Sequence, residues 1–571
     1  MTFCKYDRKD LYLLFQRIDF WVNFVIIHIV FIKKFIMENK YIEISFIKKK
    51  YPLLFKIFSV IPGFFAISLI VLIVTSFCLF FLNRDENLNN IIFFTAIVIL
   101  WFYLWWLIRW FEFIIFTFMA SFKIINYKKL NFDKILKNSW GLKNEEILFR
   151  NKLKKDILPE EIIHRFIIPT YKESFEIIKE TCENLLNSNY DKRKFAITLA
   201  WEERDEQNFL VIAKKIIEKY KDKFFYINYT VHPKWIEWEI PGKWANISFS
   251  SKKEYENILN AFGVAPDKVV VTTLDADTNI DSDYPNILTY NYIVADNRKY
   301  KSYQPMIFFF NNFWDAPFFS KIISLGNSFW MLFNSLKKFG MRNFSTHAQS
   351  LDALIETDFW SKETIVEDGH QYRRSYFVFG SKYECLPIFT KVYQDCNLNT
   401  NIFFTAKAQY NQIRRWAHGA EDLAYVLCQW VYNKSKVSFG RTFYEFMRLF
   451  EWTILWSTLH IVLMFWFTFT LIKDIPLSSF MGLGGAISFF VKISFLIFIF
   501  VIWLQMIFTP WNKLKSTSEK IKRTWIFLWL YLFLIGPTLF IFSWMPALHS
   551  QIAIMIWKPM KKFNITKKVR K

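Results

Sequence analysis

Long stretches of almost uncharged, apolar residues lie on both sides of the centre of this 571-residue chain, and they constrain its fold more than any other feature. A helix that crosses the hydrocarbon core of a bilayer needs about 20 apolar residues. The runs near or above this length are residues 57–82, 91–108, 452–472, 485–508 and 524–545. The chain is also 53% hydrophobic and 20% aromatic, which is too apolar for an ordinary soluble protein of its size. We therefore predict a polytopic membrane protein.

The acidic residues gather in the centre of the chain, which predicts a water-facing domain between the apolar runs. Lysines flank the first two runs, and the loop between them holds one basic residue, Arg84. By the positive-inside rule, the N-terminus and the central domain face the cytosol, as in a multi-pass protein of the plasma (inner) membrane. The side of the basic tail stays open. The expected parts are a cytosolic or interfacial segment 1–52, two spans in 53–120, the domain 140–440, three spans in 450–546, and the tail 547–571.

The formal net charge of +23 would suit a nucleic-acid binder. However, basic residues crowd the ends of the apolar runs, where they mark the cytosolic face and favour anionic lipid. The chain has no zinc-finger spacing or helix-turn-helix pattern, so we expect the bilayer, and no nucleic acid, as a partner. The six cysteines have no paired spacing, which argues against a disulfide framework or a Cys-rich metal site.

Strand-like and helical patterns alternate in the first part of the central domain. Alternation of this kind predicts a parallel sheet with right-handed crossovers, in which ligands bind beyond the carboxyl ends of the strands. Polar motifs stand at those ends, at Pro169–Glu173, Glu202–Asp205 and Asp275. The strand patterns are residues 166–168, 195–199, 224–230 and 269–274, and the helical patterns are 173–186 and 210–217.

The acidic pair Asp275-Ala276-Asp277 follows the last of these strand patterns. Such pairs are also common turn formers. In an extended segment, residues i and i+2 point the same way, so both carboxylates could bind one hard cation. Mg²⁺ or Mn²⁺ held there would offset the charge of a leaving diphosphate.

Two further motifs follow in order along the chain. Glu367-Asp368 supplies a carboxylate for proton abstraction, although an acid pair can also begin a helix. Gln412-Ile413-Arg414-Arg415-Trp416 combines guanidinium groups, which bind oxyanions with two hydrogen bonds, with a ring suited to the apolar face of a sugar. The alternative for this segment is an amphipathic helix whose Arg414 reaches the membrane surface.

In this order, between apolar runs, the three motifs resemble the membrane-embedded inverting glycosyltransferases of family 2, which include the cellulose, chitin and hyaluronan synthases. The resemblance covers about residues 160–420 and implies an α/β GT-A-like (Rossmann-like) cytosolic domain inserted between α-helical transmembrane segments. Two positions depart from the family pattern. Glu202-Glu203 replaces an aspartate pair that contacts the base, which weakens an assignment of uridine, and Val366 replaces the threonine of a Thr-Glu-Asp element.

The resemblance also implies roles for individual residues. Asp368 is the expected general base, and Asp275 and Asp277 are the expected ligands of Mg²⁺ or Mn²⁺. The substrate-binding residues that it implies are Thr170, Glu173, Glu202, Lys243, Asn246, Gln412, Arg415 and Trp416.

The implied activity is that of a family 2 hexosyltransferase, which transfers a sugar from a nucleotide-sugar, expected to be a UDP-sugar, to a polysaccharide or glycolipid at the cytosolic membrane face. No clear Phe-Phe…Thr gating element follows Trp416, so polymer synthesis and single-sugar transfer to a lipid both remain open. A membrane transporter or scaffold with a degenerate, non-catalytic domain is the alternative from another class. Loss of Asp277, Asp368 or Trp416 would have favoured it, and all three are present.

Two other features carry expectations. The aromatic stretch 306–333 is interrupted by polar residues and predicts interfacial helices at the acceptor entrance. His347, His370 and His418 stand near the motifs without metal-ligand spacing, so we expect them to support the site or to lie on the surface.

Overall fold

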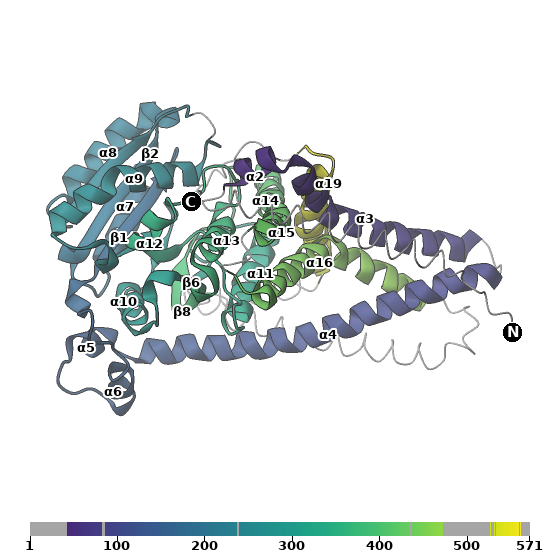
Figure 1. Ribbon diagram of the computed structural model, residues 1–571, viewed down its shortest axis with the longest axis horizontal. Helices are drawn as coiled ribbons and strands as arrows, with labels where there is room; N and C mark the ends of the chain where they lie inside the picture. Colours follow the sequence, from purple (N-terminus) through teal and green to yellow (C-terminus); the bar gives the residue numbers. More distant parts are fainter. Residues whose placement is uncertain are drawn as a thin grey trace, which may run out of the picture.

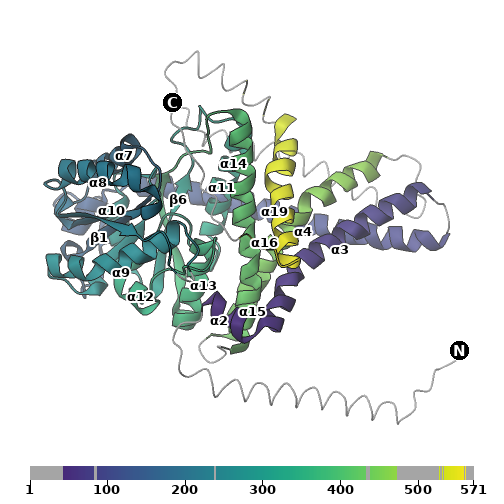
Figure 2. The same cartoon turned by 90° about the horizontal axis from the view of Figure 1, so that it is seen from above.

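The computed structural model describes residues 43–82, 86–236, 239–432, 437–471 and 533–558, together with Ile526, Leu530 and Met560. Within these residues, an α/β domain lies at one end and a bundle of long helices extends from the other (Figure 1). The same arrangement is seen from above in Figure 2, where α3, α4 and α16 leave the domain on one side. The predicted span at 485–508 lies outside the described residues.

One eight-stranded sheet forms the centre of the domain, in the order β3-β2-β1-β4-β7-β6-β8-β5. The parallel arrangement predicted for the first part of the domain is confirmed, because β1, β2, β3 and β4 are parallel. The remaining strands make the sheet mixed: β7 runs antiparallel to β4 and β6, β5 runs antiparallel to β8, and β6 and β8 are parallel. The strands are β1 (Ile163–Thr170), β2 (Phe195–Glu202), β3 (Tyr226–His232), β4 (Val269–Thr273), β5 (Asn279–Ile280), β6 (Lys301–Phe308), β7 (His347–Ser350) and β8 (Glu384–Tyr393).

Helices cover both faces of the sheet. All residues of β1, β2 and β4 are buried, which explains why these strands read as continuous apolar runs rather than alternating ones. One face packs against α5 (Phe132–Lys137), α7 (Phe175–Leu186), α8 (Glu206–Tyr220) and α10 (Tyr284–Val294), and the other against α9 (Lys243–Phe262) and α12 (Leu351–Glu356). Short helix α6 (Asn144–Arg150) joins α5.

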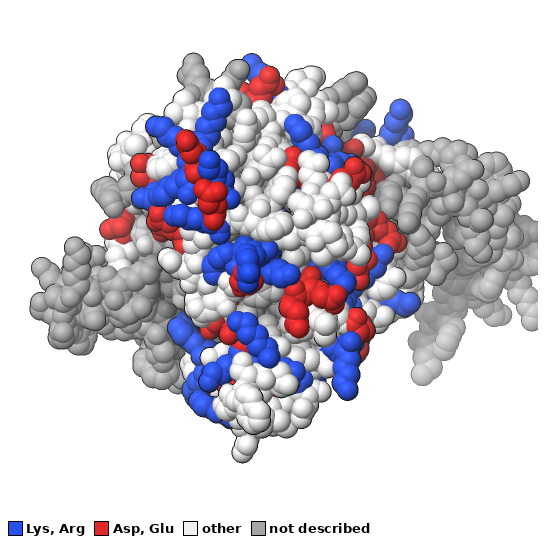
Figure 3. All heavy atoms as spheres, turned by 90° about the vertical axis from the view of Figure 1, so that its left-hand side faces the viewer, with Lys and Arg blue, Asp and Glu red and all other residues white. Residues whose placement is uncertain are grey.

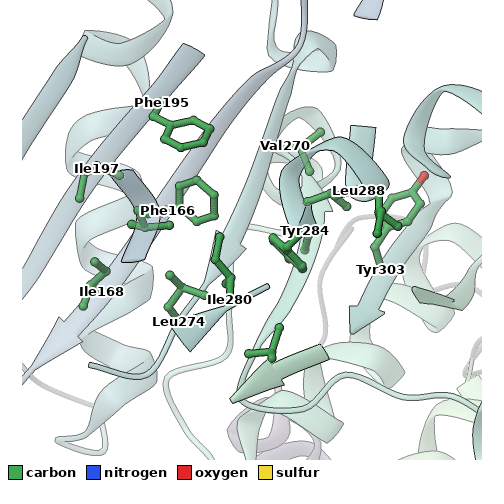
Figure 4. Packing of buried hydrophobic residues seen from close by; sticks show 14 of the residues in the cluster. Phe166, Ile168, Phe195, Ile197, Val270, Leu274, Ile280, Tyr284, Leu288 and Tyr303 are labelled. Carbon is green, nitrogen blue, oxygen red and sulfur yellow. The ribbon is translucent and has the colours of Figure 1, made fainter. Parts of the chain in front are cut away.

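An apolar core lies on each face of the sheet, and the larger one is between the sheet and α7, α8 and α10. Figure 4 shows Phe166 of β1 and Phe195 of β2 side by side, with Tyr284 and Leu288 of α10 over the neighbouring strands. The rings of Phe166 and Phe195 meet edge to face, with their centroids 5.2 Å apart. Burial of each such side chain stabilises the fold by about 1.5–3 kcal/mol, so this core fixes the strands that carry the polar motifs.

A third apolar cluster joins the domain to the long helices. It contains residues of β6 and β8 and of α11 (Phe318–Ser335), α13 (Glu367–Phe379) and α15 (Asp422–Tyr432), packed with α2 (Ile44–Lys50), α3 (Pro52–Leu82) and α4 (Glu86–Lys129). The predicted interfacial helices at 306–333 are therefore only half right. The first part is the end of β6, and α11 is mostly buried in this cluster.

Two described stretches, Pro52–Thr75 and Phe533–Met555, are long and apolar enough to cross a membrane, with mean hydropathy of 2.7 and 1.3. Length and composition alone are weak support for membrane insertion, because a buried core helix of a soluble protein passes the same test. In the second stretch, 44% of the apolar window is buried within the protein. Helix α4 has 44 residues, about 66 Å at 1.5 Å per residue, so it is much longer than the predicted span and continues beneath the domain to α5 (Figure 1).

The C-terminal described segment is helical through the boundary at which we expected the tail. Pro537 does not break it. Instead, residues 533–539 continue into a π-helical turn, η10 (Phe540–Trp544), and then into α19 (Met545–Met555). Helix α19 packs against α3, against α14 (Ile402–Ala417) and against α16 (Phe439–Leu471).

Charged side chains of both signs share the end of the domain that faces away from the bundle. Lysine and arginine are interspersed with aspartate and glutamate on this face, as Figure 3 shows. The high net charge is therefore not gathered into one continuous basic surface there.

A glycine makes the contact between α3 and α19 close. A Cβ atom at Gly63 would lie 3.0 Å from the carbonyl oxygen of Gln551 and 3.1 Å from the Cβ of Met555. Small residues allow such close helix approach. We expect Gly63→Leu to destabilise the protein by about 1–3 kcal/mol, the usual cost of overpacking, measured as a lower midpoint of thermal unfolding in detergent.

Gly326 of α11 is the matched control, because a Cβ there would meet nothing within 4 Å. Gly326→Leu should leave the midpoint unchanged or raise it. An equal fall for both variants would contradict the close approach of α3 and α19.

Candidate functional site

The turn after β4 carries Asp275 and Asp277. Thr278 closes this turn, because its backbone N–H donates to the carbonyl oxygen of Asp275 at 2.9 Å and its hydroxyl accepts from the Asp275 N–H at 3.0 Å. The expected extended geometry is therefore wrong. The two carboxylates do not share a face through strand alternation but are presented by a turn to different partners.

Asp275 is held by residues from two other elements. The Lys243 ammonium, at the first position of α9, forms an ion pair with Asp275 Oδ1 and donates to the carbonyl oxygen of Ser345 at 3.2 Å. Gln394, just after β8, donates to Asp275 Oδ2 at 3.2 Å. The ion pair between Lys243 and Asp275 therefore joins α9, on one face of the sheet, to the carboxyl end of β4.

Asp277 is buried, with 2% of its surface exposed. Its Oδ2 accepts from the backbone N–H of Asp395 at 3.0 Å, and its carbonyl oxygen accepts from Asn311 at 2.9 Å. Both aspartates thus contact the segment that follows β8.

Asp368 lies at the second position of α13, and its Oδ1 accepts from the backbone N–H of Gly369 at 2.8 Å. Burial raises the pKa of Asp368 and the charge of Asp275 adds to this, while the Gly369 hydrogen bond, Lys243 and Arg415 act to lower it. The net direction is upward. Asp275, Lys243 and Arg415 therefore all lie close enough to Asp368 for their charges to act on it, and Lys243 and Asp275 are themselves paired.

The first turns of α13 are held by the buried carboxylate of Asp422, the first residue of α15. Asp422 accepts from Arg373 at 2.5 Å and pairs with His370 Nδ1 at 2.7 Å, and Arg373 also donates to the carbonyl oxygen of Gly369 at 2.8 Å. Burial would raise the pKa of Asp422, but Arg373 and His370 outweigh it and hold that pKa below its usual value. This network sets the position of the turn that carries Asp368.

The Gln412, Arg415 and Trp416 side chains share one face of α14, because they stand at positions i, i+3 and i+4 of the helix. All three are half-buried, and Gln409 donates to Gln412 Oε1 at 3.2 Å. Helix α14 packs against η10 and α19, one of the two stretches apolar enough to span a membrane.

Thr170 and Asn246 are buried and share one hydrogen-bond acceptor. Thr170 donates to the carbonyl oxygen of Ala200 at 3.3 Å, and Asn246 donates to the same oxygen at 2.6 Å. The two side chains are 2% and 1% exposed. They tie the ends of β1 and β2 to the start of α9, and a role of either residue in substrate binding stays a prediction.

Glu173 and Glu202 also have partners within the protein. Glu173 accepts from the backbone N–H of Tyr171 and so closes the turn after β1. Glu202, at the end of β2, accepts from Arg204 at 2.8 Å, and the Arg204 guanidinium lies 5.1 Å from the centre of the Tyr171 ring. A carboxylate, a guanidinium and an aromatic face are thus adjacent where β1 and β2 end.

The three histidines are buried rather than exposed. His347 is stacked on Trp244, with ring centroids 5.6 Å apart, and accepts from Trp360 Nε1 at 3.1 Å. Burial lowers the pKa of His347 to about 3, so this ring is neutral. Trp360 also contacts Trp244, with ring centroids 5.9 Å apart, so the three rings pack together.

The carboxylates fit a cation that is shared with a diphosphate better than a resident one. Among the residues that the structure describes, no three His, Cys, Asp or Glu side chains are grouped as a metal site. Mg²⁺ is commonly held by one or two carboxylates together with substrate phosphates. Asp275 and Asp277 can supply those carboxylates, with Lys243 as a further positive charge beside a phosphate.

Sequence reasoning missed Gln394, Ser345 and Asp422. None has a local signal, since each acquires its role through a partner on another element. Only the short polar run Gln394–Asn397, directly after the apolar pattern of β8, could have drawn attention to the segment that faces the two aspartates.

No protein-family model matches this sequence, and no curated protein matches it. Among solved structures, the chain is similar to the mannosyltransferase PcManGT from Pyrobaculum calidifontis in complex with GDP-Man and Mn²⁺, with 11% identity and a TM-score of 0.37 over 69% of this chain and 99% of that one. It is also similar to S. aureus TarS 1–349 in complex with UDP-GlcNAc, with 13% identity and a TM-score of 0.29 over 48% of this chain and 74% of that one.

A third similar structure is GalNAc-T7 with UDP, GalNAc and Mn²⁺, at 10% identity and a TM-score of 0.31 over 52% of this chain and 58% of that one. All three TM-scores lie below 0.5. We therefore base a function on the residues of this chain alone.

If the cation is shared with a nucleotide, Mn²⁺ should bind the protein weakly alone and more tightly when UDP or GDP is present. Asp277→Asn should weaken this nucleotide-dependent binding at least about tenfold, because the amide oxygen carries no charge. Free Mn²⁺ measured by electron paramagnetic resonance gives the affinity without any need for turnover.

Asp283→Asn is the control. Asp283 is the N-cap residue of α10 and accepts a hydrogen bond from Asn189, and among the contacts that the structure describes it has none with Asp275 or Asp277. Tight Mn²⁺ binding without nucleotide, or binding that survives Asp277→Asn unchanged, would contradict the assignment.

Proposed function

We propose that this protein is a glycosyltransferase that transfers a sugar from a nucleotide-sugar to an acceptor at a membrane surface. The observation that carries the proposal is the convergence of Asp275, Lys243, Arg415 and Asp368 beyond the carboxyl end of β4. These residues come from four separate elements, in the chain order in which the motifs resemble family 2 enzymes. In α/β sheets, ligands bind in the crevice beyond the carboxyl ends of the strands, and Asp275 follows such an end.

The two sides of a displacement reaction need opposite electrostatics, and the proposed site has both. Diphosphate oxygens would lie beside Lys243 and beside a Mg²⁺ or Mn²⁺ ion held by Asp275 and Asp277, which offsets charge as the phosphate leaves. Asp368 would stand on the acceptor side. Transfer with inversion then requires the base and the leaving group to be on opposite faces of the anomeric carbon.

In the proposed step, Asp368 takes the proton of the acceptor hydroxyl as that oxygen bonds to the anomeric carbon. The bond from this carbon to the phosphate oxygen breaks, and the diphosphate leaves with the electron pair. The raised pKa of Asp368 makes it a stronger base than an exposed aspartate, while the charges of Lys243 and Arg415 act to lower that pKa and so favour the ionised form.

The nucleotide base would lie where β1 and β2 end, beside Tyr171 and the pair formed by Glu202 and Arg204. This pair offers both acceptors and donors, so it does not restrict the donor to uridine. UDP-sugars and GDP-sugars both belong in the first test.

The acceptor would meet the enzyme at α14. Trp416 and Arg415 lie on a helix that packs against α19, and α3 packs against α19 in turn. If α3 and α19 are in the bilayer, a saccharide end or a lipid-linked sugar at the surface can reach this face. Synthesis of a cell-envelope polysaccharide or glycolipid is the setting that we propose.

Asp368→Asn tests the base. Incubation of the detergent-purified protein with labelled nucleotide-sugars and Mn²⁺ should yield polymer or glycolipid. The variant keeps the shape but loses basicity, so transfer should fall at least about 10²-fold while nucleotide affinity is retained.

Asp133→Asn is the control, because Asp133 pairs with Lys137 on α5, away from the proposed site. Loss of nucleotide affinity in Asp368→Asn would make Asp368 a binding residue. An inactive wild-type protein with the complete panel would favour the non-catalytic scaffold or transporter.

The pH dependence of transfer follows from the direction of the Asp368 pKa. A base must be ionised, so kcat/KM should rise with pH through a midpoint above 3.8, the ordinary value for aspartate. Arg415→Gln removes a charge that lowers this pKa, and the midpoint should move to higher pH. A midpoint that does not move would show that Arg415 does not act on the base.

Trp416→Ala tests the acceptor side. Loss of the ring removes a stacking partner worth about 1 kcal/mol, so transfer to the acceptor should fall more than hydrolysis of the donor by water. Both rates can be measured in one assay from released nucleotide and glycosylated product. Equal losses would place Trp416 in the donor pocket or in the core.

A further inference from the structure

A seven-residue helix, α2, connects the first long apolar helix to the segment that leads into Asp368. Residues Ile44–Lys50 are followed within two residues by α3. Ile44 and Ile47 are buried in the cluster that joins the domain to the long helices. Polar residues of α2 and its N-cap contact the segments on either side of Asp368 and after Trp416.

The N-cap residue, Glu43, contacts one residue before and one residue after Asp368, within the segment 361–374 that is called the catalytic segment below. Its Oε2 accepts from the Ser361 hydroxyl at 2.8 Å, and its Oε1 forms an ion pair with Arg374 of α13. Ser45 adds a second contact, since its N–H donates to Glu363 at 2.7 Å and its hydroxyl donates at 2.5 Å. Four polar contacts therefore join this short stretch to residues 361–374.

Arg374 in turn holds the strained turn that precedes Asp368. It donates to the carbonyl oxygens of Thr357 at 3.0 Å and Phe359 at 2.8 Å. In the same turn, Asp358 and Phe359 have φ angles of 53° and 59°. These angles lie in the left-handed region that non-glycine residues rarely adopt. Such a conformation persists only where its surroundings fix it.

Glu43 is placed to keep Arg374 in that position. Arg374 is buried, so its charge needs a partner. Burial would raise the pKa of Glu43, but Arg374, His370 and Ser361 outweigh this and hold it below its usual value. The carboxylate is therefore ionised at neutral pH.

The far end of α2 contacts the other side of the site. Lys48 forms an ion pair with Glu421 at 2.5 Å, five residues after Trp416 and next to Asp422. Helix α2 thus contacts the segment that follows Trp416 and the segment that precedes Asp368. It does so directly before the start of α3.

We propose that α2 is a positioning element that couples α3 to the catalytic segment, and that Glu43 is its central positioning residue. Through Arg374 and Ser361, Glu43 fixes the turn at 357–363 and so sets where Asp368 stands relative to the donor. The catalytic consequence rests on the proposed function, whereas the structural coupling does not.

Hydrogen–deuterium exchange of the full-length protein in detergent tests the coupling without turnover. The amides of Asp358 and Phe359 are bonded within the turn, to Ile355 and Leu354. In Glu43→Gln these amides should exchange about tenfold faster, because a charge-assisted hydrogen bond has been weakened. Asp156→Asn, which breaks an ion pair with Arg298 away from the site, should change nothing in this segment.

A double-mutant cycle makes the test specific to the contact. Ser361→Ala alone should also raise exchange in the turn, and Glu43→Gln with Ser361→Ala should raise it by less than the product of the two single effects. Independent, multiplying effects would overturn the coupling through Ser361. Unchanged exchange in Glu43→Gln would overturn the proposal as a whole.

Activity supplies the catalytic part. With UDP and GDP as binding probes in Mn²⁺, Glu43→Gln should bind nucleotide like the wild type, while kcat falls about tenfold or more, as displacement of a catalytic group by ~1 Å can cost ~10²-fold. Glu43→Asp should recover part of kcat. Altered exchange with unchanged kcat would overturn the catalytic role, and a wild type without transferase activity would refute the proposed function but leave the exchange result valid.

Discussion

The pairing of β4 with strands of opposite direction on its two sides is the constraint on which the site depends. On one side β4 continues the parallel set β1 to β3, and on the other it pairs antiparallel with β7. The chain that leaves β4 therefore turns beside the segment that leaves β8. Asp275 and Asp277 lie in this turn, against Gln394 and the backbone of Asp395.

The electrostatics of the site follow from that meeting point. Helices α9 and α13 both begin there, so Lys243 and Asp368 lie near the positive ends of two helices. The Lys243 ammonium neutralises Asp275, while Asp368 has no such ion pair among the contacts that the structure describes and is desolvated instead. The two carboxylates thus have different surroundings, one paired with an ammonium and the other desolvated, and this difference is the basis for proposing different roles for them.

Local pattern was enough for the strands that are buried on both faces. The runs at 166–168 and 195–199 lie within β1 and β2, and the run at 269–274 covers all of β4, because continuous apolar residues have few other places in an α/β domain. Residues 347–350, which form β7, read His-Ala-Gln-Ser and carry no strand pattern. Their place is set by pairing with β4 and β6, which no short window of sequence reports.

The site shows the same division. Motif order located Asp275, Asp368 and Arg415, and the charges of Asp275 and Arg415 act on Asp368 in the structure. It did not show that Thr170 and Asn246 both donate to the carbonyl oxygen of Ala200. Strand alternation also gave the wrong geometry for Asp275 and Asp277, since Thr278 turns the chain at once. Glu43 and Arg374 are far apart in sequence, so their ion pair has no local signature.

The contact of Gly63 with Gln551 and Met555 has a consequence for how the protein is made. The two sides of this contact lie near opposite ends of the chain, so α3 leaves the ribosome long before its partner exists. At the ~5–20 residues per second of translation, the interval is roughly half a minute to two minutes. During this time the glycine face of α3 has to be shielded by lipid, by a chaperone or by another helix. The α/β domain, whose own strands are complete by Tyr393, can fold in the meantime, and the bundle closes last.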